Sequence, residues 1–220
     1  MANMIIKPAA DGNLVLQDRA GGAVLTTAAT GATIADGIAL GTPASGVLTN
    51  MTGAIGSTVT GFTGIKEYDE WRLTSDFTSG TSGAQYYLTA NLERVDTAGF
   101  QKLGTGMGES SGIFSFPTTG YWRVSFCVRC TDNARFDYNR PHIWLTTDGS
   151  NYVAMITGCL GGDRSAGDPE RSTMIEGVFD ITSTTNCKVK FSTQNSDPVT
   201  INGNSSISET YFTFMRIGDT

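Results

Sequence analysis

Residues 112–130 read GIFSFPTTGYWRVSFCVRC, and this stretch decides the fold of the chain. From Tyr121 onward hydrophobic and polar residues alternate, which is the two-residue period of a half-buried strand. Pro117 presets the backbone of a turn, and Gly120 supplies a permissive backbone where one strand must lead into the next. We therefore expect a short strand, a tight turn and a long strand. The side chains expected to face the core are Trp122, Val124, Phe126 and Val128, and those expected to face away from it are Arg123, Ser125, Cys127 and Arg129.

Further strands are predicted on both sides of this stretch, because short apolar runs alternate with turn residues. Residues 143–145 and 152–156 flank the turn at residues 147–150, which predicts a hairpin. The polar stretch 161–171 predicts an exposed loop. The other predicted strands are residues 71–74, 86–88, 92–95, 174–180, 187–191 and 211–217. So many short strands indicate an all-β sandwich or jelly roll.

The composition excludes several classes of protein. Only 16% of the 220 residues are charged, against about 25% in an average soluble domain, and 27 are Gly. Because 39% of the residues are hydrophobic, the chain can bury a core, which argues against intrinsic disorder. The heptad pattern of a coiled coil is missing. The net charge of −6 disfavours nucleic acid as a partner, because neutralising phosphates needs clustered Lys and Arg.

Neither membrane insertion nor classical secretion is predicted. The sequence contains no run of about 18 apolar residues, the length that a membrane-spanning helix needs. Residues 1–8 have no apolar stretch long enough for a signal peptide.

The composition changes near residue 65, which predicts a domain boundary. Residues 1–64 contain no Trp or Tyr, a single Phe (Phe62) and few charges, whereas all 3 Trp and 7 Tyr lie after them. Two apolar runs, residues 14–16 and 23–25, predict a small hairpin in this first part. Its apolar residues are too sparse for a core of its own. We expect residues 1–65 to pair with copies of themselves or to dock on another surface, and residues 66–220 to form a separate head.

The head resembles the C1q/TNF-like jelly-roll family. The resemblance is carried by Gly112, Phe114, Pro117, Gly120 and Tyr121, together with residues 91–96 and the aromatic C-terminal stretch 211–219. It implies an all-β jelly-roll sandwich preceded by a Gly/Thr-rich, partly β-stranded attachment or stalk segment. It also implies a compact homotrimer. The aromatic residues expected between subunits, with the core of a single chain as the alternative, are Tyr86, Tyr87, Tyr211 and Phe212.

A second resemblance lies in residues 39–53, which read ALGTPASGVLTNMTG. This string is similar to a phrase of tail-fibre and related virion proteins of bacteriophages. The resemblance implies a virion protein that assembles in the host cytoplasm. It also implies that residues 1–65 attach the chain to other structural proteins of the virion.

No redox, zinc or cofactor site is predicted. Cys127 and Cys130 have the spacing of a C-x-x-C motif, but three residues along a strand place two side chains on opposite faces, about 10 Å apart. We therefore expect packed free thiols. The single histidine, His142, completes neither a zinc site nor a Ser-His-Asp triad. The Gly-rich residues 104–108 do not match the spacing of a dinucleotide-binding loop.

The acidic residues of the loops offer two kinds of site. Asp163, Asp168 and Glu170 could act as paired carboxylates in glycan cleavage, but Arg164 and Arg171 between them favour a solvated loop. Three copies of one aspartate near a trimer axis could form an oxygen cage for calcium. The candidates for such a calcium site are Asp132, Asp137, Asp163 and Asp168.

These observations favour a non-enzymatic structural protein of a phage virion, either a trimeric fibre or a decoration protein of the capsid or tail. The alternative is a tail-fibre tip that binds a host receptor or glycan. In that case we expect ligand contacts in a loop that contains Arg135, Phe136, Tyr138 and Arg140. A depolymerase that uses the acidic loop is the third hypothesis.

Overall fold

The computed structural model of the chain describes residues 64–80, 83–131, 137–161 and 170–220, and in the N-terminal part only residue 20 and three short strands. The chain divides into two compact units, Met1–Val59 and Thr60–Thr220. The predicted domain boundary at residue 65 stays a prediction. Among the described residues, no helix has the length and apolar character needed to cross a membrane.

The N-terminal unit contains a three-stranded antiparallel sheet in the order β1-β2-β3. Its strands are β1 (Val15–Gln17), β2 (Ala23–Ala28) and β3 (Gly31–Ile34). Leu16 pairs with Leu25, so the hairpin expected from the two apolar runs is present, and β3 extends it by one strand.

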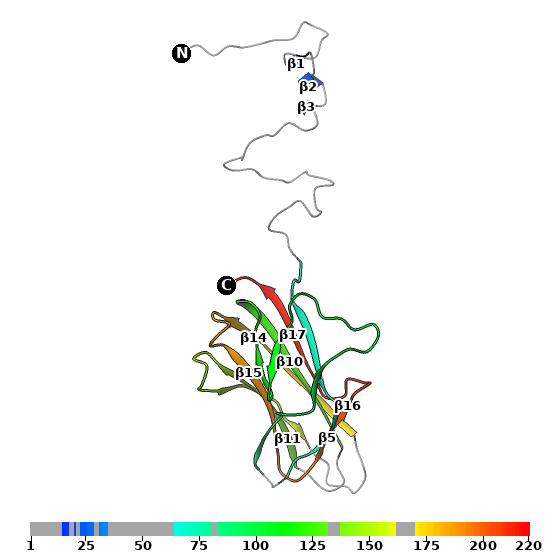
Figure 1. Cartoon of the computed structure of the whole chain (residues 1–220), viewed down its shortest axis with the longest axis vertical. Coiled ribbons are helices and arrows are strands. Elements are labelled where there is room, and N and C mark those ends of the chain that lie inside the picture. The colour runs from blue at the N-terminus through cyan, green and yellow to red at the C-terminus, as the bar shows by residue number, and fades with distance from the viewer. Residues whose placement is uncertain are drawn as a thin grey trace. The chain divides into compact units, whose positions relative to one another are not determined.

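The C-terminal unit is a sandwich of two antiparallel sheets (Figure 1). The first, called the β10 sheet, has the order β5-β16-β10-β17-β4-β7, with β14 paired to the other side of β10. Its strands are β4 (Tyr68–Leu73), β5 (Ser75–Thr78), β7 (Leu92–Arg94), β10 (Gly120–Thr131), β14 (Glu170–Ile181), β16 (Thr200–Asn204) and β17 (Tyr211–Gly218).

The second sheet, called the β15 sheet, has the order β12-β11-β15-β9-β8, and β6 also pairs with β15 while β13 pairs with β11. Its strands are β6 (Gln85–Tyr87), β8 (Gly108–Ser110), β9 (Ile113–Ser115), β11 (Tyr138–Thr146), β12 (Val153–Thr157), β13 (Leu160–Gly161) and β15 (Lys188–Asn195). The pairing of β11 with β12 confirms the predicted hairpin.

The long strand β10 confirms the alternation read from the sequence. Trp122, Val124, Phe126 and Val128 are completely buried. Their strand lies between β14 and β17, so both of its backbone edges are paired and its inward side chains are covered by the second sheet. Gly120 has φ of +135°, and the carbonyl oxygen of Gly218 lies 2.4 Å from where a Cβ would be, so the turn at this position requires glycine.

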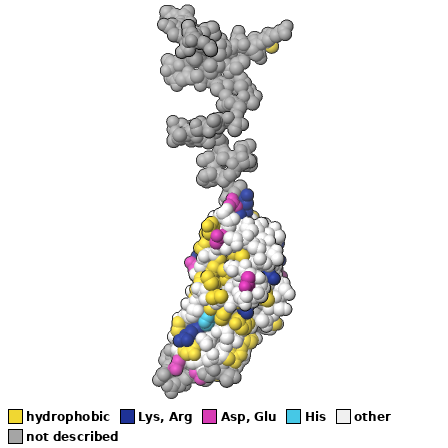
Figure 2. Space-filling model, turned by 90° about the vertical axis from the view of Figure 1, so that its left-hand side faces the viewer, with side chains coloured by type: hydrophobic (Ala, Val, Ile, Leu, Met, Phe, Trp, Pro, Cys, Tyr) yellow, Lys and Arg dark blue, Asp and Glu magenta, His cyan; other side chains and the backbone are white. Residues whose placement is uncertain are grey.

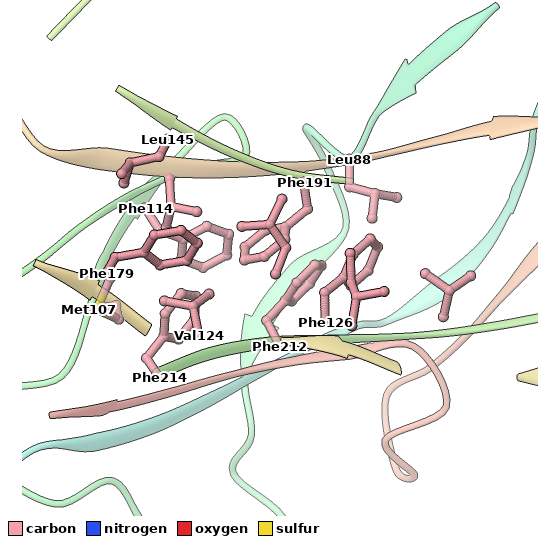
Figure 3. Close-up of a cluster of buried hydrophobic side chains, with 14 of the residues drawn as sticks. Leu88, Met107, Phe114, Val124, Phe126, Leu145, Phe179, Phe191, Phe212 and Phe214 are labelled. Atoms are coloured by element: carbon pink, nitrogen blue, oxygen red, sulfur yellow. The ribbon is translucent and has the colours of Figure 1, made fainter. Parts of the chain in front are cut away.

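An aromatic cluster fills the space between the sheets, as Figure 3 shows. Phe191 of the β15 sheet meets Phe212 of the β10 sheet with ring centroids 4.4 Å apart, and Phe126 stacks on Phe212 at 5.1 Å. Phe114 contacts the same group through Phe214 at 5.0 Å. Apolar burial of this kind contributes roughly 25 cal/mol per Å² and is the main force that joins the two sheets.

Cys127 and Cys130 are free thiols, as predicted, and Cys159 and Cys187 are free as well. Cys130 is buried with the core, whereas Cys127 lies on the opposite face of β10 and is half-buried. The strand geometry therefore separates the two thiols of the C-x-x-C motif.

Candidate functional site

The outer face of the β10 sheet carries large hydrophobic side chains with no cover in the single chain. Tyr121 of β10, Met174 and Val178 of β14 and Ile217 of β17 are 42%, 54%, 55% and 51% exposed. They face outward because their strand neighbours fill the core. We call this surface the apolar face. Figure 2 shows hydrophobic side chains gathered on the surface of the C-terminal unit that is turned to the viewer.

The edge strand β12 of the β15 sheet carries further exposed hydrophobic side chains. Val153 and Met155 of this strand are 61% and 51% exposed. A Cβ added at Gly177 of β14 would lie 2.2 Å from Cδ1 of Ile156, so β12 and β14 lie against each other at this edge of the sandwich. Gly177 pairs with the buried Val124, so this contact lies on the core side, and β12 and β14 meet at the edge where the two sheets face each other.

Both arginines that β10 places on this face form ion pairs with glutamates. Arg123 Nε donates to Glu176 Oε2 at 3.0 Å across β10 and β14. Arg129 pairs with Glu170, and its Nη1 lies 2.9 Å from Glu209 Oε1. Such exposed pairs add little stability, but they reduce the charge that would oppose contact with another apolar surface.

A hollow of about 230 Å³ lies in the middle of the apolar face. Tyr68, Tyr211 and Met215 contribute to its lining. Burial raises the pKa of Tyr68 to about 12, and the neighbouring Glu70 carboxylate adds to this rise. Burial also raises the pKa of the Tyr211 hydroxyl. These phenols are therefore uncharged at neutral pH, which keeps the hollow a neutral surface.

The outer face of the β15 sheet is different, because it carries a cluster of aromatic rings around a lysine. Lys190 Nζ lies 4.2 Å from the ring centroid of Tyr87, 4.3 Å from that of Tyr152 and 5.9 Å from that of Trp144. The rings of Tyr87 and Trp144 are themselves 5.7 Å apart. We call this surface the aromatic face.

The strand register assembles the aromatic face in cross-strand rows, because paired residues point to the same side of a sheet. One row contains Trp144, Lys190 and Ile113. The next contains His142, Ser192 and Tyr87, and the third contains Arg140, Gln194 and Gln85.

Hydrogen bonds hold the rings of the aromatic face in place. Trp144 Nε1 donates to Ser192 Oγ at 2.7 Å, and Gln85 Nε2 donates to the same oxygen. Gln85 Nε2 also lies 3.1 Å from His142 Nδ1, which accepts in this arrangement and places the ring proton on Nε2. Burial lowers the pKa of His142, and the charge of Arg140 lowers it further, so the imidazole is neutral at pH 7.

The structure does not bring the predicted trimer-interface residues together. Phe212 is fully buried within the single chain, between Phe126 and Phe191, which is the alternative that the sequence left open for it. The side chain of Tyr211, the preceding residue, lies on the apolar face, because neighbouring side chains on a strand point to opposite sides. Tyr87 lies on the aromatic face, and the ring of Tyr86 lies 6.1 Å from Phe77 of β5.

The other predicted sites lie only partly in the described residues. Tyr138 and Arg140 belong to β11 and not to a loop, and the Arg140 guanidinium stacks 4.1 Å from the Tyr138 ring centroid. Glu170 pairs with Arg129, and the backbone N–H of Asp137 donates to Ser196 Oγ at 2.6 Å. The described residues contain no group of three potential metal ligands. Arg135, Phe136, Asp132, Asp163 and Asp168 lie outside the described residues.

Sequence reasoning missed Trp144, Tyr152 and Lys190. A signal for part of this set is present, because Tyr138, Arg140, His142 and Trp144 alternate along one run and so share a face of a strand. That strand pairs with β15, which supplies Lys190, and no local sequence pattern predicts this pairing.

Comparisons with known proteins support the fold. No protein-family model matches the sequence, and no curated protein matches it. Among solved structures, Eiger TNF from S. frugiperda is similar with a TM-score of 0.50 and 8% identity over 70% of this chain and 93% of that one. Murine APRIL has a TM-score of 0.49 and 12% identity over 69% of this chain and 98% of that one. The C-terminal unit is therefore a TNF-like jelly roll, which confirms the predicted fold class.

Proposed function

We propose that the chain is a non-enzymatic structural protein of a bacteriophage virion, in which a homotrimer of jelly-roll heads is displayed on a fibre, a tail or a capsid. The observation that carries the trimer is the apolar face, where the exposed hydrophobic side chains of β10, β14 and β17 have no cover in the single chain and Arg123 and Arg129 form ion pairs with glutamates. Large exposed apolar surfaces of this kind are typical of protein–protein interfaces.

The position of the apolar residues favours a closed ring of copies. The edge of β12 and β14, with Val153 and Met155, can pack against the face that carries Tyr121 and Ile217 in the next copy. Such a contact joins two different patches, so it closes into a ring when the rotation between copies allows it. The C1q/TNF-like family that the head resembles consists of compact homotrimers, which agrees with a ring of three.

The virion assignment is supported by the phrase at residues 39–53 and by the composition of residues 1–65. In this proposal the first 65 residues attach the chain to other virion proteins during assembly in the host cytoplasm, and the head stays outside. Because the described carboxylate of the acidic loop, Glu170, is held by Arg129, it is a poor candidate for glycan cleavage.

Light scattering on the full chain after gel filtration tests the assembly. We expect a mass three times the 23.3 kDa of one chain, and a monomer at micromolar concentration would contradict the trimer. The virion assignment needs a separate experiment, in which an antibody against the head labels purified phage particles in electron micrographs. Particles without label would contradict it.

A second function, binding of a host receptor or glycan, is supported by the aromatic face. Rings on a rigid sheet, held by hydrogen bonds, are a pre-organised binding surface. Adsorption of the labelled trimer to susceptible host cells tests this function, and a trimer that adsorbs to no such cell would contradict it.

A further inference from the structure

We propose that the aromatic face binds an acidic polysaccharide, with sugar rings on Tyr87 and Trp144 and uronate carboxylates at Lys190. This inference rests on the proposed host-glycan function and names the ligand class and the site. The rings lie 5.7 Å apart, and the Lys190 ammonium lies against the Tyr87 ring.

The first argument is the charge of Lys190. No described carboxylate forms an ion pair with Lys190. Its Nζ is instead placed between the rings of Tyr87 and Tyr152. Burial against these rings lowers the pKa of the ammonium, so the folded chain holds a partly desolvated cation without an opposite charge. A ligand carboxylate would supply that charge, and cations in such surroundings form strong charge-assisted hydrogen bonds.

The second argument is the charge of the surrounding sheet. Strands β6, β11, β12 and β15 contain Arg140, Lys188 and Lys190 but no Asp or Glu. This is unusual in a chain with 21 acidic and 15 basic residues and a net charge of −6. The aromatic face is therefore a basic surface on an acidic protein, and it is complementary to a polyanion.

The third argument concerns the shape of the ligand. Tyr87 is 36% exposed and Trp144 is partly exposed, so the rings offer an open surface rather than an enclosed pocket. An extended chain of sugars fits such a surface, because each sugar ring has an apolar C–H side that can stack on an aromatic ring and hydroxyl groups at its rim. A partly exposed polar side chain that can meet those hydroxyl groups, Gln85, lies beside the rings.

Nucleic acid is a less suitable polyanion, because neutralising its phosphates needs clustered Lys and Arg, whereas one cation, Lys190, lies among the rings. The aromatic face is on the outer side of the β15 sheet, whereas the apolar face is on the outer side of the β10 sheet. A trimer formed through the apolar face therefore leaves three aromatic faces accessible. Three weak contacts on one polysaccharide chain increase the apparent affinity without any new contact.

The test is titration of the full chain with oligomers of galacturonate, mannuronate and glucuronate, and with a neutral glucose oligomer of the same length. We expect binding to at least one uronate, no binding to the neutral oligomer and a steep loss of affinity between 50 mM and 500 mM salt. Trp144→Ala and Lys190→Gln should each lower the affinity about tenfold or more. Lys66→Gln, which removes the same charge from a position before β4, should leave the affinity unchanged.

Two further measurements keep the result interpretable. Trp144→Phe, which retains a ring, should restore most of the binding that Trp144→Ala loses. Light scattering on every variant shows whether the trimer persists. Failure of all three uronates to bind an intact trimer overturns this inference and leaves the proposed structural function standing. Equal binding of neutral and acidic oligomers also overturns it, whereas a monomeric chain overturns the proposed trimer.

Discussion

The two outer faces of the sandwich use the same strand geometry for different surfaces. On the apolar face, Arg123 pairs with Glu176 across two strands, and exposed Met174 and Val178 surround the pair. On the aromatic face, Lys190 has rings around it and no described carboxylate as a partner. The inner faces of both sheets must fill one core, so their residues are constrained alike. The outer positions do not have to fill the core. Their residue types therefore indicate what kind of partner or ligand each surface contacts.

The largest expected effect is a loss of stability, and it should differ between a residue on the inner face of a strand and its neighbour on the outer face. Phe212→Ala removes a ring at the centre of the aromatic cluster and should lower the free energy of unfolding by about 3–5 kcal/mol. Tyr211→Ala, one residue away on the apolar face, should lower it by less than half as much. Urea unfolding followed by Trp fluorescence at one protein concentration measures both. Equal losses would contradict the division between core and outer face.

The next effect concerns assembly. Replacing Met174 and Val178 together by Glu places two carboxylates per chain on the apolar face, where a neighbouring copy would have to desolvate them. We expect the mass in light scattering to fall from that of a trimer to the 23.3 kDa of one chain. Ile207→Glu is the control, because Ile207 is 62% exposed but lies in the loop before β17. A double variant that stays trimeric would show that the contacts between copies do not lie on the apolar face.

The smallest effect is a pH dependence on the aromatic face. Burial lowers the pKa of His142 below its usual 6.5, so the folded chain binds this proton less readily than the unfolded chain. The free energy of unfolding should therefore fall as the pH decreases from 6.5 through the lower pKa of the folded state. Protonation also places an N–H on Nδ1, where Gln85 Nε2 now donates.

Thermal unfolding between pH 7.5 and pH 5 measures this dependence. His142→Gln is the comparison, because it removes the titrating group and keeps a polar side chain. The difference between the two pH profiles gives the contribution of His142 alone, because the carboxylates titrate at lower pH and are the same in both chains. Parallel profiles would contradict a proton-linked role of this histidine.

The core strand of the fold was predictable, whereas the strand order was not. The alternation through Trp122, Val124 and Phe126 is local, and the glycine at position 120 marks the turn before it. The strands β5, β8 and β16 were missed because they are short and have few hydrophobic residues. They are strands because neighbouring strands satisfy their backbone hydrogen bonds, which is a tertiary effect.

The candidate sites show the same limit. Tyr87 was singled out from the sequence as an aromatic residue for a trimer interface, but the structure places it beside Trp144 and Lys190. Tyr211 and Phe212 were assigned together, although adjacent residues on a strand cannot share a face. The alternation along β17 already separates the two positions in the sequence.

The sequence by itself determined the all-β class, the long strand β10 and the free state of Cys127 and Cys130, because these depend on the period of one strand and on its turn residues. Tertiary structure alone decided which outward residues became neighbours. Lys190 follows Tyr87 by about a hundred positions, and only the pairing of β6 and β11 with β15 joins it to the rings. Pairing between distant strands is chosen by the packing of the whole core, so no local pattern could place the apolar and aromatic faces on opposite sides of one sandwich.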